Sequence, residues 1–198
     1  MGYLSGRRIG LLIHLRGNDI REKFEGVFVA QTGGIICNNG KWQRVPMKTD
    51  ASMTFFVLHQ KLQETGFIDW AMKQGDKFLF PELMRLQDPS KSASQYMGRL
   101  FEKAGVTAKQ KEVFHSLRHG NIESLRDNKV DERDRKLQVG HALENEHDLY
   151  GYEAISEARA REIARMPLPE EVDFSMFEGL NFEKLANGKR NLGRRRKQ

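Results

Sequence analysis

Four side chains between residues 115 and 150 are suited to chemistry on a phosphodiester: His115, Arg118, His141 and Tyr150. An arginine presents a planar fork of donors that fits two phosphate oxygens, and it keeps its charge at any working pH. Histidines can donate hydrogen bonds or transfer protons near neutral pH, and a tyrosine hydroxyl can act as a covalent nucleophile once its proton is removed. The combination indicates a site that binds and attacks a phosphate group.

The order and spacing of these residues resemble the second conserved box of the tyrosine recombinases, the phage integrase family. That box reads His-x-x-Arg, then Gly-His, then a tyrosine nine positions later. In this chain the pattern is met by His115, Arg118, Gly140, His141 and Tyr150. Tyr152 is a competing nucleophile. Two features favour Tyr150: it lies nine residues after His141, and it forms a Tyr-Gly pair with the next residue.

A segment near the N-terminus resembles the first recombinase box, in which a Gly-x-Arg turn leads into a helix. Gly6 and Arg8 meet this pattern, and an apolar stretch after them ends in the sequence LRGNDI, residues 15–20. The resemblance implies that Arg8 is the first active-site arginine, although Arg7 would be an equal choice without it. The family usually has an acid three residues after this arginine, and this chain has Leu11 there.

Residues 24–47 contain β-branched and aromatic runs separated by glycine turns, and they predict three short antiparallel strands with a tight hairpin. The segment resembles the family's hairpin, whose turn carries a lysine that protonates the leaving 5′-oxygen. Asn38 occupies the usual lysine position, and Lys41 follows three residues later. Lys41 is therefore a candidate catalytic residue, with a plain surface lysine as the alternative.

Apolar residues at helical spacing predict helices around the motif residues. A turn at Ser5-Gly6 should lead into a helix that ends near Leu15, and further helices are expected over residues 51–64, around 96–101, from about 114, over 131–138 and over 153–166. The chain is therefore predicted to be α+β, mainly α, with a small three-stranded antiparallel sheet. The resemblance implies the helical catalytic domain of the DNA breaking-rejoining enzymes.

A zinc site is the alternative chemistry for the helix that begins near residue 114. His115 and His119 have the four-residue spacing of a metalloprotease helix, and they share a face with Arg118. Ser116 stands where that motif needs its general-base glutamate, which argues against zinc. No metal or other cofactor is expected.

The composition argues against membrane and secreted proteins. No run approaches the ~18 apolar residues of a membrane span, and no secretory signal is visible. The single cysteine, Cys37, cannot form an internal disulfide, which agrees with a reducing compartment. We expect a cytoplasmic protein, which the resemblance would place in a bacterial or phage-infected cell.

The net charge of +6 is concentrated at the C-terminus. The last twelve residues hold six basic side chains and no acid, so residues 1–186 carry 27 basic and 27 acidic side chains. A basic DNA-facing surface would therefore have to arise by segregation of charges on the fold.

We expect three parts of the chain, of which the resemblance implies the first and the composition indicates the other two. Residues 1–166 correspond to the catalytic domain, without the DNA-binding domains that usually precede it. Residues 167–186 form an acidic segment rich in aromatic residues, which could pack in cis or dock on a neighbour. Residues 187–198 form a basic tail that is expected to be disordered until it meets an anion.

The implied function is site-specific DNA recombination. In the family mechanism the tyrosine, here Tyr150, attacks the scissile phosphate of double-stranded DNA and forms a 3′-phosphotyrosyl intermediate. A tetramer in the synapse and accessory DNA-bending proteins would be the partners. Three alternatives remain: a catalytically impaired integrase remnant that binds DNA, an enzyme like the type IB topoisomerases, and an interaction module that acts through residues 170–186.

Overall fold

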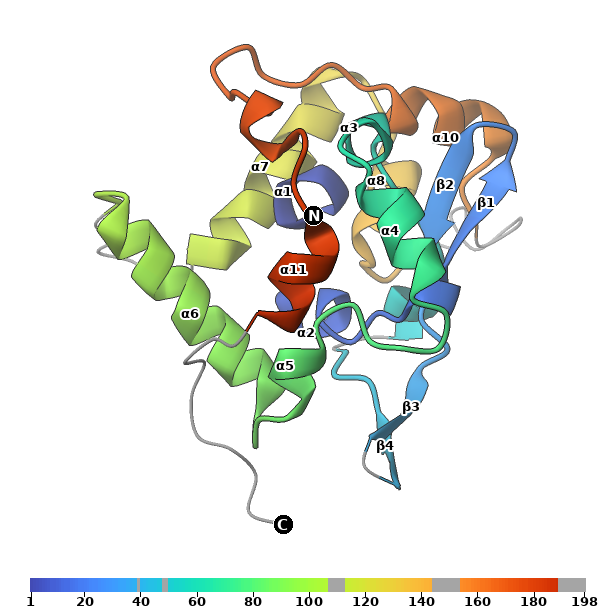
Figure 1. The fold of residues 1–198 in the computed structure, drawn as a ribbon. Helices are drawn as coiled ribbons and strands as arrows, with labels where there is room; N and C mark the ends of the chain where they lie inside the picture. Colours follow the sequence, from blue (N-terminus) through green and yellow to red (C-terminus); the bar gives the residue numbers. More distant parts are fainter. Residues whose placement is uncertain (39, 48–49, 107–112, 144–153, 189–198) are drawn as a thin grey trace.

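The structure is a computed structural model that describes residues 1–38, 40–47, 50–106, 113–143 and 154–188. It is an α+β fold in which helices predominate and two small antiparallel sheets are present (Figure 1). At this level the predicted fold class is confirmed. No helix in the described ranges is both long and apolar enough to cross a membrane.

The predicted three-stranded antiparallel sheet is present, but its strands differ from those expected. Strands β1 (Ile20–Phe24), β2 (Val27–Ala30) and β5 (Phe56–Val57) form it in the order β1-β2-β5. Strands β3 (Ile35–Asn38) and β4 (Lys41–Arg44) form a separate hairpin. Residues 24–47 therefore hold three strands and the predicted tight hairpin, but these three strands do not form one sheet, because β2 pairs with β1 and with β5, which follows the hairpin in sequence.

The predicted helix over residues 51–64 is also wrong. This segment contains a 3-10 turn, η2 (Asp50–Met53), then β5 and a short helix, α3 (Gln60–Glu64). Phe56 packs in one hydrophobic core, whereas Phe55 and Val57 pack in the other. Alternate residues of a strand point to opposite faces, so a continuous apolar run suits a strand that is buried on both sides.

The N-terminal segment forms two short helices, α1 (Gly2–Ser5) and α2 (Ile9–Leu12). Gly6 ends α1 with φ +62°, which confirms the predicted turn. A Cβ at Gly6 would lie 2.8 Å from Val139 Cγ1, so glycine is needed for the close approach of this turn to α8. The predicted helix to Leu15 ends earlier, at Leu12.

The helices expected around the motif are present, and local signals explain their ends. Helix α8 begins after Asp131, whose carboxylate accepts a hydrogen bond of 2.9 Å from the backbone N–H of Asp134. It ends at Gly140, which has φ +74°. The motif region comprises α7 (Val113–Asp127), α8 (Glu132–Val139) and α10 (Glu157–Ala164). The remaining helices are η1 (Gly17–Asp19), α4 (Phe67–Lys73), α5 (Pro81–Met84), α6 (Pro89–Lys103), η3 (Ser175–Phe177) and α11 (Phe182–Asn187).

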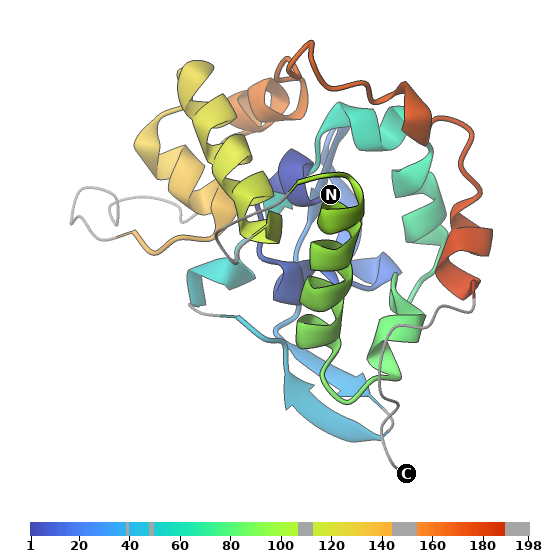
Figure 2. The same cartoon turned by 90° about the vertical axis from the view of Figure 1, so that its left-hand side faces the viewer.

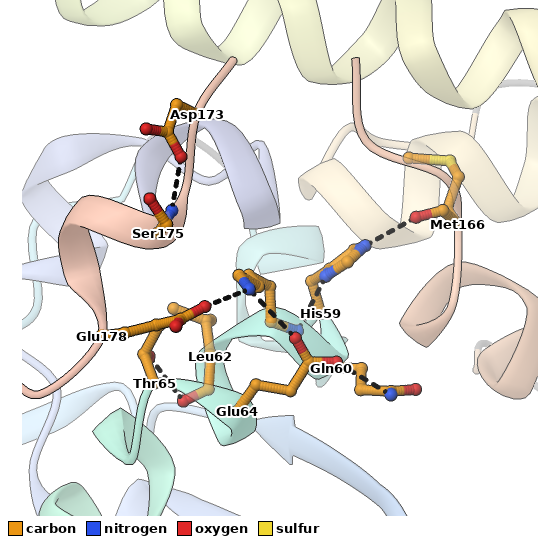
Figure 3. A network of polar contacts seen from close by, with 10 residues as sticks. His59, Gln60, Leu62, Glu64, Thr65, Met166, Asp173, Ser175 and Glu178 are labelled. Carbon is orange, nitrogen blue, oxygen red and sulfur yellow. Dashed lines mark hydrogen bonds and ion pairs between the residues drawn. The ribbon is translucent and has the colours of Figure 1, made fainter. Parts of the chain in front are cut away.

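The segment after Met166 packs against its own chain. His59 Nε2 donates a hydrogen bond of 2.7 Å to the carbonyl of Met166, and Lys61 Nζ lies 3.0 Å from Glu178 Oε1 (Figure 3). Phe182 contacts Trp70, with ring centroids 5.7 Å apart. Residues 167–186 could pack in cis or dock on a neighbour, and these contacts are of the first kind. Residues 189–198, most of the expected basic tail, lie outside the described residues.

The β3–β4 hairpin extends away from the helices in both views (Figure 1 and Figure 2). Arg16 contacts the hairpin near its turn, because its Nη2 donates a hydrogen bond of 3.1 Å to the carbonyl of Cys37, one residue before the Asn38–Lys41 pair. In Figure 2, α6 crosses the front of the molecule with its first turn nearest the hairpin. The hairpin and the start of α6 therefore lie at the same end of the fold.

Candidate active site

Helix α7 places Arg118 at the centre of the fold. Its side chain is 2% exposed, and its Nη1 donates hydrogen bonds of 2.7 Å to the carbonyls of Gly6 and Val139. The guanidinium therefore joins the turn before α2 to the C-terminal end of α8. The Nη2 atom of the same group is shielded from solvent and has no hydrogen-bond partner in the described structure.

Arg8 is the N-terminal cap residue of α2, beside Arg118. Its Nη1 is also shielded from solvent, and no partner for it occurs within the described ranges. Burial lowers the pKa of Arg118 to about 10, and the positive charge of Arg8 contributes to that shift. Arg118 therefore stays charged at neutral pH. Each guanidinium group thus keeps a shielded donor that a bound anion could satisfy.

Arg7 has a different environment from its neighbour. It is fully buried, and it donates hydrogen bonds to five backbone carbonyls, of which those of Leu137 and Gln138 are each 2.7 Å away. These two carbonyls belong to the last turn of α8, where carbonyls lack the usual i+4 partner of a helix, although that of Leu137 also accepts a hydrogen bond of 3.3 Å from the backbone N–H of Gly140. Burial, with the charges of Arg118 and Arg8, lowers the pKa of Arg7 to about 9. Arg7 stabilises the structure, and its donors are directed at the backbone.

Gly140 brings His141 into this group of arginines. A Cβ at Gly140 would lie 3.2 Å from Arg7 Cζ and 3.2 Å from Ser52 Cα, and the residue has a positive φ. Gly140 therefore both ends α8 and permits a close approach of Arg7 and Ser52. The backbone N–H of His141 donates a hydrogen bond of 2.9 Å to the carbonyl of Lys136.

The imidazole of His141 is neutral at physiological pH. Burial lowers its pKa to about 4, and the charges of Arg118, Arg8, Arg7 and His115 act in the same direction. The charges that act most on His141 among the described residues are therefore all positive. A neutral imidazole can donate through one ring nitrogen and accept a proton at the other. A bound anion would oppose the positive charges and raise this pKa.

The structure brings together four of the six predicted site residues: Arg8, His115, Arg118 and His141. Tyr150, the predicted nucleophile, lies outside the described residues, as does its competitor Tyr152. The described part of the chain thus contains the predicted arginines and histidines of the site, without the predicted nucleophile.

Lys41 is not brought to this cluster. It is exposed and pairs with Asn38 beside the turn of the hairpin that extends from the helices. In the register of the hairpin Lys41 shares a face with Ile36, which is buried. Leu11 is 2% exposed in a hydrophobic core, so it is a packing residue where the family has an acid.

Sequence reasoning did not identify two polar residues beside the site. Asn121 follows Arg118 by one helical turn, is 4% exposed, and has an Oδ1 atom with no hydrogen-bond partner among the residues described. Gln138 is buried, and its side-chain amide exchanges two hydrogen bonds of 2.9 Å with the backbone of Val57. The position of Asn121 could have been inferred from its three-residue spacing from Arg118, which places both on one side of the helix. No pattern of neighbouring residues in the sequence indicated the position of Gln138.

Of the pair considered for zinc, His115 is half-buried and His119 is exposed. The rings of His115 and His119 make an edge contact, with centroids 4.9 Å apart. Within the ranges described, no group of three or more His, Cys, Asp or Glu side chains is placed to hold a metal ion.

Comparisons with protein-family models, with curated proteins and with solved structures found no match. The function must therefore be inferred from the residues of the site and their surroundings.

Proposed function

We propose that this protein cuts and rejoins double-stranded DNA as a site-specific tyrosine recombinase. The observation that supports this most is the pair of shielded guanidinium nitrogens, one each on Arg8 and Arg118, that have no partner in the described structure. They adjoin His141, which is neutral at physiological pH. A buried donor without a partner costs free energy, and a tetrahedral phosphate would satisfy both donors.

In the proposed reaction the Tyr150 oxygen attacks the scissile phosphorus, and the bond from phosphorus to the 5′-oxygen breaks. The products are a 3′-phosphotyrosyl link and a free 5′-hydroxyl, whose oxygen would gain the proton released by Tyr150, passed on by a histidine or by water, and rejoining reverses these steps. Negative charge builds on the non-bridging oxygens in the transition state, where Arg8 and Arg118 would stabilise it. His115 and His141 would supply hydrogen bonds or accept the tyrosine proton. Loss of one such donor costs on the order of 100- to 1000-fold in rate.

The test is a nicked suicide substrate, in which loss of a short 5′-hydroxyl strand traps the covalent adduct. Wild type should form the adduct, Tyr150→Phe should not, and the matched control Tyr152→Phe should retain it. No adduct with wild type on its target site, or an adduct that persists in Tyr150→Phe, would refute the proposal. Relaxation of supercoiled DNA without site preference would instead indicate a type IB topoisomerase activity.

A catalytically impaired remnant that binds DNA is the second candidate. It is favoured by the exposed position of Lys41 on the hairpin and by the buried Leu11 in place of an acid. The remnant would bind duplex DNA in a salt-sensitive manner without forming any adduct. A phosphotyrosyl adduct with wild type would exclude it.

A further inference from the structure

We infer that Arg159 is a positioning residue, which holds the start of α10 against the start of α8 and so sets how far apart the two ends of the segment with Tyr150 lie. This inference rests on the proposed function and names a residue that acts on the site from outside it. In the sequence Tyr150 lies between His141, directly after the C-cap residue of α8, and Ser156, the N-cap residue of α10. The placement of α8 and α10 therefore fixes both ends of the segment that contains the nucleophile.

The side chain of Arg159 contacts two carboxylates at the start of α8. Its Nη2 lies 3.4 Å from Asp131 Oδ2, and its Nε lies 3.3 Å from Asp134 Oδ2. We call these two contacts the Arg159 bridge. Asp131 is the N-cap residue of α8, and Arg159 lies in the first turn of α10, where its backbone N–H donates a hydrogen bond of 3.3 Å to Ser156 Oγ. The bridge therefore joins the first turns of the two helices.

The Arg159 bridge adds direction to an apolar contact. Leu137 and Val139 of α8 lie in the same hydrophobic core as Ala160 and Ile163 of α10. Hydrophobic burial is non-directional, whereas the planar fork of an arginine binds carboxylates in a defined orientation. The bridge is therefore suited to select one orientation of α10 on α8.

Helix α8 carries this orientation to His141. The helix has eight residues and is about 12 Å long. The backbone N–H of His141 donates a hydrogen bond of 2.9 Å to the carbonyl of Lys136, so His141 is joined to the last turn of α8. A change at the start of α8 or α10 therefore alters the position of α10 relative to His141.

Stability alone does not account for the Arg159 bridge. Asp134 is 8% exposed, and burial raises its pKa to about 6, with the hydrogen bond and the charge of Asp131 acting in the same direction. The positive charges of Arg159 and Arg133 oppose this shift without cancelling it. Because the folded-state pKa lies above that of the unfolded chain, ionised Asp134 costs folding free energy at neutral pH. A buried ion pair of this kind is weak evidence for stability and can instead specify one arrangement of the chain.

A second arginine on α10 provides a matched control. Arg161 Nη1 donates a hydrogen bond of 2.7 Å to the carbonyl of Glu25, in the turn between β1 and β2, and its Nη2 lies 2.6 Å from Glu157 Oε1. The side chains of Arg159 and Arg161 are 30% and 32% exposed. Arg161 thus contacts the sheet side of α10, whereas Arg159 contacts the helix that precedes His141.

The first experiment measures the rate of adduct formation on the suicide substrate and the affinity for the uncut duplex. Arg159→Gln should lower the rate by about 10- to 100-fold, because a misplacement of about 1 Å in a reacting group can cost about 100-fold. Arg159→Lys keeps the charge and should restore part of the rate. Arg161→Gln should react like wild type. Both glutamine variants lose one positive charge from the same helix, so they should bind the duplex with equal affinity.

A variant of Asp134 separates positioning from stability. Asp134→Leu removes the buried carboxylate together with its cost, so it should unfold at the same urea concentration as wild type or at a higher one. Its rate of adduct formation should nevertheless fall like that of Arg159→Gln. A variant that is as stable as wild type and also reacts at the wild-type rate would overturn the inference.

A third measurement does not depend on the reaction. The carboxyl carbon of Asp134 is followed by NMR as the pH is varied. Arg159→Gln should raise the pKa of this carboxyl, because the substitution removes a positive charge that lowers it, and Arg161→Gln should leave it unchanged. An unchanged pKa in Arg159→Gln would overturn the inference.

The outcomes distinguish the inference from the proposed function. If the pKa of Asp134 rises in Arg159→Gln but wild type forms no adduct, the bridge between the helices stands and the proposed reaction fails. If wild type forms the adduct and Arg159→Gln reacts at the wild-type rate, only the inference about Arg159 fails.

Discussion

Neighbouring arginines, Arg7 and Arg8, should respond in opposite ways to the same substitution. Arg7 is fully buried and donates to five backbone carbonyls, whereas Arg8 keeps a shielded donor without a partner in the described structure. We predict that Arg7→Gln lowers stability and that Arg8→Gln mainly lowers activity. Both changes remove one positive charge and leave a side-chain amide, so they form a matched pair.

The magnitude for Arg7 follows from its contacts. Two short and three longer charge-assisted hydrogen bonds are together worth roughly 5 to 10 kcal/mol. Burial lowers the pKa of Arg7 from its ordinary value to about 9, which corresponds to about 5 kcal/mol of charge burial that the substitution relieves. The net loss in the free energy of unfolding is on the order of 3 kcal/mol. For a domain of this size that loss lowers Tm by about 6 to 12 °C.

Arg8→Gln removes a positive charge beside Arg118 and breaks no hydrogen bond of the described structure. Its stability should therefore stay within about 0.5 kcal/mol of wild type. The rate of adduct formation on the suicide substrate should fall by roughly 100- to 1000-fold, because a phosphate ligand is lost.

The assays are urea unfolding, thermal unfolding and adduct formation, with Arg99→Gln on the exposed side of α6 as the control for loss of one surface charge. If Arg7→Gln were as stable as wild type, or if Arg8→Gln were strongly destabilised, the assignment of the two arginines would be wrong.

Three further predictions concern His141, Gly140 and Phe182. The folded pKa of His141, about 4, lies below its unfolded value near 6.5, so the unfolded chain binds more protons between them. The free energy of unfolding should fall by on the order of 3 kcal/mol as the pH drops from about 6.5 to about 4, and His141→Gln should flatten this dependence in urea unfolding. Gly140→Ala should cost at least about 1 kcal/mol of stability, measured in the same way, because its φ is positive and its Cβ would crowd Arg7. Phe182→Ala should lower the free energy of unfolding by about 3 kcal/mol or less, since the ring is only partly buried. It should also shift the fluorescence of Trp70, which the ring of Phe182 contacts, and unchanged fluorescence would contradict packing of α11 in cis.

Residues 167–186 could also dock on a neighbouring molecule, because some of their apolar side chains are exposed. Phe182 contacts Trp70 in cis, whereas Met176 is 68% exposed and Phe177 is 43% exposed. An oligomer that dissociates when residues 170–186 are removed would support an assembly role. An unchanged oligomeric size would argue against it.

Helices and their ends were the most predictable part of this protein. Helix α8 could be located from Asp131, which caps its start, and Gly140, which ends it in the left-handed region. These signals act between residues a few positions apart, so they are visible in the sequence. The same holds for His115 and Arg118, whose spacing on α7 places them on one side of the helix.

Long-range contacts decided the rest. Residues 55–58 were predicted as helix, but they form a strand region because β2 pairs with one edge of β5 and the side chain of Gln138 pairs with the other. The different roles of Arg7 and Arg8 likewise depend on carbonyls of α8 about 130 residues away. The sequence by itself determined which side chains are available for phosphate chemistry. Only the tertiary structure decided which of the two arginines keeps a donor without a partner among the described residues, because backbone carbonyls around Arg7 use the donors of that residue.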